Sequence, residues 1–141
     1  MPSELILVVE DNEKNLKLVC DMLHFYGYRT VESSTAEEGL EIARIQQPAL
    51  ILMDIQLPGM DGITALRHLK ADSSTGHISV MAVTASATTL DREQIMTAGF
   101  DGYVIKPIHV KEFHKHVRSI IDLAYETRNR TDPSSSAGVG T

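Results

Sequence analysis

Charged side chains stand directly after three short apolar runs of this chain. An apolar run of four or five residues that stops at a charge is typical of a strand buried on both faces, whose end reaches solvent. The ends of parallel strands share one edge of a sheet, and open α/β sheets place their sites at that edge. The charged residues that follow the runs 5–9, 50–53 and 103–105 are Glu10, Asp11, Asp54 and Lys106.

Three of these residues, Glu10, Asp11 and Asp54, are carboxylates. Carboxylates at one edge repel one another unless a cation lies among them, and Mg²⁺ uses hard oxygen ligands of this kind. Each acid also has an ordinary interpretation. Asp54 can form an Asx turn with the loop that follows, and Glu10 with Asp11 can stabilise the start of a helix through its dipole. Their joint position favours a metal site.

Lys106 and Thr84 also end strand-like runs. Lys106 precedes Pro107, and a cis bond there would aim the ammonium group across the edge towards Asp54, although only about 5% of such bonds are cis. The ordinary alternative is a solvated lysine before a helix. Thr84 follows the run 78–83 and is either a helix N-cap or a hydroxyl presented at the edge.

Apolar runs alternate with amphipathic stretches along the chain, a pattern typical of βα units around a parallel sheet. Asn12 is the expected N-cap of the first helix, Gly27 and Gly99 are expected helix stops, and Ile45 is expected on an apolar helix face. The expected strands are 4–9, 29–33, 49–53, 78–83 and 102–105, and the expected helices are 13–26, one opened by Ser34 or Thr35, one after the loop 56–62, 89–97 and 110–125.

Composition limits the functions that the chain can have. The 141 residues fit one domain, and the formal net charge of −6 argues against direct binding of nucleic acid. No apolar stretch approaches the ~20 residues of a membrane span, so we expect no membrane insertion and a cytoplasmic protein. The single cysteine, Cys20, is expected to be a buried apolar residue. We expect a domain over residues 1–126 and a disordered tail over 127–141.

Four motifs together resemble the receiver domain of two-component response regulators. The resemblance runs from about Leu5 to Leu123. Within the family, the chain is similar to stand-alone, single-domain regulators of the DivK type and to receivers of hybrid kinases. The motifs are Val8–Asn12, Leu52–Gly62, Val83–Ala85 and Tyr103–Pro107.

The resemblance implies a flavodoxin-like α/β fold, a doubly wound (βα)5 unit whose five parallel strands have the order 2-1-3-4-5. It also implies Mg²⁺, for which Mn²⁺ can substitute, and a phosphoryl group accepted from the phosphohistidine of a histidine kinase or a histidine phosphotransfer protein. Asp54 would be the phosphoacceptor and a metal ligand. The other implied roles are Asp11 as a direct metal ligand, Glu10 as a ligand through water, Gln56 as a ligand through its backbone carbonyl, and Thr84 with Lys106 as contacts of the phosphoryl group.

The resemblance further implies a signalling switch and not an enzyme with a separate substrate. Thr84 and Tyr103 stand where the family's hydroxyl and aromatic switch residues change position together. Phosphorylation would then alter a surface that contacts a downstream effector protein or kinase, and self-phosphorylation and self-dephosphorylation would be the only reactions.

Three other classes of protein share parts of this pattern. A phosphatase of the haloacid-dehalogenase kind usually has a second Asp two residues after its nucleophile, where this chain has Gln56. A flavodoxin-like FMN binder would have a phosphate loop after the first strand, where Glu10 and Asp11 would repel phosphate. A degenerate receiver that acts as a scaffold would normally lack an acid or the lysine, and all are present.

Overall fold

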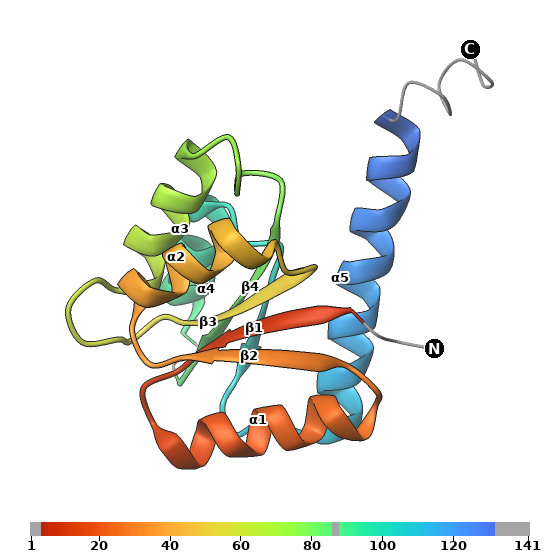
Figure 1. The fold of residues 1–141 in the computed structure, drawn as a ribbon. Helices are drawn as coiled ribbons and strands as arrows, with labels where there is room; N and C mark the ends of the chain where they lie inside the picture. Colours follow the sequence, from red (N-terminus) through yellow and green to blue (C-terminus); the bar gives the residue numbers. More distant parts are fainter. Residues whose placement is uncertain (1–3, 86–87, 132–141) are drawn as a thin grey trace.

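The computed structural model describes residues 4–85 and 88–131. Five parallel strands form one sheet in the order β2-β1-β3-β4-β5 (Figure 1). The fold class and strand order expected from the resemblance are therefore confirmed. The strands are β1 (Leu5–Val9), β2 (Arg29–Ser33), β3 (Leu50–Asp54), β4 (Ser79–Thr84) and β5 (Gly102–Ile105).

Helices cover both faces of the sheet. Figure 1 shows α1 and α5 on one face and α2, α3 and α4 on the other, as expected when every connection between parallel strands crosses over through a helix. The helices are α1 (Glu13–Phe25), α2 (Ala36–Gln46), α3 (Gly62–Ala71), α4 (Thr89–Ala98) and α5 (Val110–Thr131).

Alternate residues of the central strands pack into two separate hydrophobic cores, one on each face of the sheet. In β3, Ile51 and Met53 face the helices α2, α3 and α4, whereas Leu50 and Leu52 face α1 and α5. All five residues of β3 are buried, including Asp54 at its end. A strand covered on both faces needs apolar side chains at every position, which explains the continuous apolar runs of the sequence.

The helix ends use the caps that the sequence predicts. The Asn12 side chain accepts a hydrogen bond from the Asn15 N–H (3.0 Å), and Thr35 likewise caps α2 through the Glu38 N–H (3.2 Å). Gly99, with φ of +109°, ends α4 in the left-handed conformation that glycine adopts without strain. These caps define where α1 and α2 begin and where α4 ends.

The apolar face predicted for α2 is wrong at Ile45, whose exposed fraction is 71%. The buried positions of α2 are small residues, Ala36, Gly39 and Ala43. A Cβ added to Gly39 would lie 2.9 Å from the Val9 side chain. Because α2 approaches the sheet this closely, small residues occupy the contact and the larger Ile45 points away from it.

Helix α5 ends at Thr131, six residues after its predicted end at Tyr125. The predicted disordered tail is therefore wrong for residues 127–131, which are helical, and residues 132–141 lie outside the described residues. Two of the five residues in this segment, Arg128 and Arg130, are good helix formers. Within residues 4–85 and 88–131, no helix has the length and apolar character needed to span a membrane.

Gly62 starts α3 directly beside the end of β3. A Cβ added to it would lie 2.5 Å from the Asp54 carbonyl oxygen and 2.9 Å from the Ile55 Cα, and backbone atoms cannot rotate away. We expect Gly62→Ala to lower the free energy of unfolding by about 1 to 3 kcal/mol, measured by urea denaturation. Gly102→Ala is the matched control, since the nearest atom there is the flexible Cδ1 of Ile120 at 3.0 Å. Equal losses in both variants would contradict this role of Gly62.

Cys20 is buried in the core under α1, with an exposed fraction of 3%. Burial, followed by the neighbouring Glu32 carboxylate, raises the pKa of the thiol to about 12. Because the thiolate is the reactive form, we expect the native protein to resist iodoacetamide at about pH 8 and the urea-unfolded protein to react fully. Intact mass measures the label, and Cys20→Ser is the control without a thiol. Rapid labelling of the native protein would contradict the buried position.

Candidate functional site

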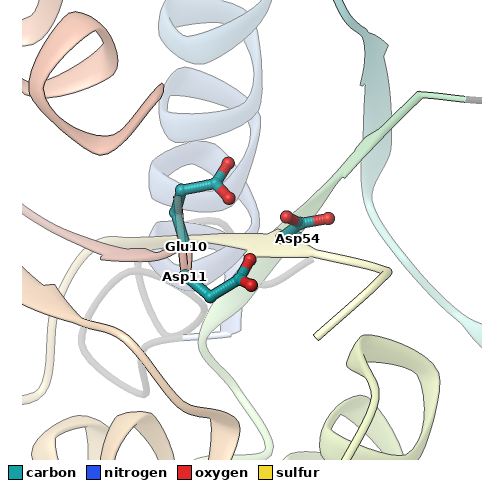
Figure 2. A group of neighbouring side chains, drawn as sticks. All are labelled: Glu10, Asp11 and Asp54. Carbon is teal, nitrogen blue, oxygen red and sulfur yellow. The ribbon is translucent and has the colours of Figure 1, made fainter. Parts of the chain in front are cut away.

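The three carboxylates predicted from the sequence lie together at the carboxyl edge of the sheet. Val9 of β1 is paired with Met53 of β3, so the residues that follow them are neighbours. One oxygen from each of Glu10, Asp11 and Asp54 lies within 4.8 Å of the other two. Figure 2 shows the carboxyl groups turned towards a common space beyond the ends of these two strands. The predicted clustering of these acids is confirmed.

Two of the three carboxylates are buried and one is exposed. The exposed fraction is 4% for both Glu10 and Asp54, whereas Asp11 is open to solvent. Burial, and then the hydrogen bond with Asp54, raises the pKa of Glu10 above its usual value. A buried carboxylate beside another one is costly to ionise, so this edge favours a positive charge.

Lys106 supplies one positive charge to the two buried carboxylates. Its ammonium nitrogen lies 3.0 Å from Glu10 Oε1 and 3.2 Å from Asp54 Oδ2. Burial lowers the pKa of Lys106, but the hydrogen bond to Glu10 and the charge of Asp54 outweigh it and raise the pKa above its ordinary value. The contact with Asp54 confirms the predicted direction of Lys106, and the bond to Pro107 is cis. The contact with Glu10 was not predicted.

Backbone groups hold the carboxylates in place. The Gln56 N–H donates to Asp54 Oδ1 (3.0 Å), and the Asn12 N–H donates to Glu10 Oε2 (3.2 Å). The loop after β3 is fixed in turn by the Gly62 N–H, which donates to the Ile55 carbonyl (3.0 Å). Sequence analysis missed Gly62 as a site residue, although a glycine at the start of an expected helix was a signal of close approach.

Thr84 and Tyr103 lie on the two strands beyond β3. Thr84 is the last residue of β4, has an exposed fraction of 4%, and its carbonyl accepts a hydrogen bond from the Lys106 N–H (2.8 Å). It is therefore at the edge, and the helix N-cap of α4 is Thr88. Tyr103 on β5 is half-buried and packs against the core under α2, α3 and α4.

The donor set at this edge fits a hard divalent cation. Three carboxylates offer oxygen ligands that face one space, whereas neither histidine nor cysteine contributes a ligand to this group. Carboxylate oxygens with open positions left for water or a phosphate are the usual protein environment of Mg²⁺. The arrangement can therefore hold such an ion beside the Asp54 carboxylate.

Comparison with known proteins gives the same family throughout. A model of the response regulator receiver domain matches residues 6–118. The polar-differentiation response regulators DivK of Brucella ovis and Brucella melitensis are each 42% identical over 116 residues, which cover 82% of this chain and 94% of each relative. The predicted similarity to regulators of the DivK type is confirmed.

Solved structures of receiver domains share the fold. The receiver domain of a sensor histidine kinase from Pseudomonas aeruginosa, solved with a magnesium ion in its active-site cleft, is 32% identical with a TM-score of 0.79 and covers 85% of this chain and 98% of that one. A CheY-like receiver domain protein from Methanospirillum hungatei is 28% identical with a TM-score of 0.79, covering 89% and 98%. Since the family model and these relatives match the segment that carries the acidic strand ends, the chain belongs to the response regulator receiver family of two-component signalling.

Proposed function

We propose that Asp54 is the residue that accepts the phosphoryl group in this signalling switch. The observation that carries the proposal is the position of its carboxylate, at the buried end of the central strand β3 and within 3.2 Å of the Lys106 ammonium. An Asp54 oxygen would attack the phosphorus of a phosphohistidine. The P–N bond breaks and its electron pair stays with the imidazole of the donor, so the histidine is restored and Asp54 carries an acyl phosphate.

Asp54, Glu10 and Asp11 would hold Mg²⁺ or Mn²⁺, and the Gln56 carbonyl is a proposed fourth ligand. The cation, when bound, neutralises charge on the phosphoryl oxygens during transfer. The exposed Asp11 is suited to a direct contact. The buried Glu10, already bonded to Asn12 and Lys106, is suited to hold a water ligand.

Lys106 and Thr84 would stabilise the phosphoryl group once it is on Asp54. The Lys106 ammonium contacts the Asp54 carboxylate, and the charge of a phosphoryl group in its place would attract that ammonium more strongly. Thr84 ends the neighbouring strand, so its hydroxyl is a second proposed donor. Neither residue takes up a proton in this proposal; both act by fixed charge and position.

Phosphorylation would be read out through β5, because Lys106 directly follows this strand and Tyr103 lies on it. Movement of Thr84 towards the phosphoryl group would leave room for Tyr103 to turn inward, which changes the surface formed by α4, β5 and α5. The proposed partners are a histidine kinase or histidine phosphotransfer protein as donor, and an effector protein or kinase as reader. Self-phosphorylation from a small donor and self-dephosphorylation would need no other catalyst.

We expect one phosphoryl group to be added to the protein by acetyl phosphate in the presence of Mg²⁺, and none to Asp54→Asn. The amide of the variant is not a nucleophile at this position, whereas its size matches the carboxylate. Intact-protein mass measures the gain, and treatment with base should remove it because acyl phosphates hydrolyse in base. Asp61→Asn, at the exposed N-cap of α3, is the matched control and should keep the gain. A gain in Asp54→Asn equal to that of the wild type would overturn Asp54 as the acceptor.

We expect Asp11→Asn to weaken Mg²⁺ binding by roughly tenfold or more, since it removes a charged ligand. Isothermal titration with MgCl₂ measures the affinity. Asp21→Asn is the control, because Asp21 is an exposed acid on α1 whose partner is Lys17 and not the site. Unchanged Mg²⁺ affinity in Asp11→Asn would remove Asp11 from the ligand set.

Lys106→Ala should still bind Mg²⁺ but should lose phosphorylation-dependent affinity for a partner.

A further inference from the structure

A second group of metal-ligand side chains lies beside β5, outside the carboxylate site. His109, Glu112 and His116 line a cavity of about 330 Å³, whose other lining residues include Tyr103, Lys106 and Pro107. No role in phosphoryl transfer has been assigned above to these three side chains. Imidazole nitrogen with one carboxylate is a ligand set typical of Zn²⁺ and related transition cations.

The spacing of the three residues places them on one face of α5. The His109 carbonyl accepts a hydrogen bond from the Phe113 N–H (2.9 Å), so His109 already follows the helical path although α5 begins at Val110. At 3.6 residues per turn, the three positions lie within a sector of roughly 60° around the helix axis. Their Cα atoms span roughly 10 Å along that axis, with Glu112 between the two histidines.

All three side chains are exposed and free to move. In the part of the chain that the structure describes, none of them makes a hydrogen bond or ion pair through its side chain. Two other histidines are engaged elsewhere: His24 contacts Thr30 Oγ1 (2.8 Å), and the ring of His114 stacks on that of Tyr26 at 3.6 Å. A cation would therefore bind the three side chains without breaking an existing contact.

We propose that His109, Glu112 and His116 form a binding site for Zn²⁺ or a similar divalent transition cation. Among the described residues, ligand atoms already lie within 4.8 Å of one another only at Glu10, Asp11 and Asp54, so the three side chains converge by rotation when the cation binds. Side chains of a helix lean towards its N-terminus, which directs His116 towards Glu112. His109 precedes the first turn, where no preceding helical turn restricts its rotamer.

A cation at this position would couple two elements of the signalling surface. It would be held on the first two turns of α5, in a cavity that Tyr103 and Pro107 also line. Bound metal would therefore stiffen the connection between β5 and α5 and occupy space open to a protein partner. None of the three proposed ligands is a residue proposed for phosphoryl transfer. A negative result for this cation site would therefore leave the proposed function untested and unchanged.

The test is isothermal titration of the full chain with ZnCl₂ in an excess of Mg²⁺, which keeps the carboxylate site occupied. We expect one Zn²⁺ per chain, with an affinity that falls roughly tenfold or more in His109→Ala, Glu112→Gln and His116→Ala. The imidazole signals of His109 and His116, followed by NMR during the titration, should shift together with the same midpoint. Because the three positions are exposed, the variants should stay folded, which circular dichroism checks.

His68→Ala is the matched control, since His68 is an exposed histidine of α3 that lines a different cavity. Its Zn²⁺ affinity should equal that of the wild type. Three results would overturn the proposal: no Zn²⁺ binding in excess Mg²⁺, equal affinities in all variants, or a loss of binding only with Asp11→Asn. The last result would assign the Zn²⁺ to the carboxylate site, and would leave the proposed function untouched.

Discussion

The contact of one ammonium group with two buried carboxylates sets the charge balance at the carboxyl edge of this sheet. Lys106 lies within 3.2 Å of both Glu10 and Asp54, which would otherwise repel each other at the ends of neighbouring strands. Removing one partner from such a buried group leaves an uncompensated charge, which is strongly unfavourable. The single lysine cannot neutralise both acids and the exposed Asp11, so the edge keeps a surplus of negative charge. This surplus is what makes it attractive to a divalent cation.

The rest of the fold holds these charges at fixed positions. Two hydrophobic cores pack the sheet between two layers of helices. The carboxylates and the ammonium group lie at one edge of the sheet, at or just after the ends of β1, β3 and β5. Fixed positions suit the phosphoryl transfer proposed for this edge, because that reaction depends mainly on positioning and charge stabilisation. Gly62 helps to keep the loop after β3 in position, because a side chain there would clash with the backbone of Asp54. A substitution of that glycine would therefore affect both the stability of the fold and the position of Asp54.

Much of this arrangement could be predicted because buried parallel strands have an unambiguous signature. The apolar runs that stop at Glu10 and Asp54 gave both the strands and the clustering of their acids, and the caps at Asn12 and Thr35 fixed the helix starts. The prediction that was wrong and the contact that was missed both depended on distances between elements. Ile45 was misassigned because the close approach of α2 to β1 is not visible in its own periodicity. The contact between Lys106 and Glu10 joins residues far apart in the sequence and has no local signal.

The length of α5 shows how a local error can arise inside a correct fold. The family model ends at residue 118, but the helix continues to Thr131. Its first turns pack Phe113 and Val117 into the core, whereas Leu123 and Tyr125 near its end are exposed, with fractions of 63% and 65%. Burial therefore accounts for the packed turns of the helix, whereas its exposed later turns depend on helix propensity. A boundary predicted from the loss of apolar residues therefore marks the end of packing, and the helix itself extends beyond that boundary.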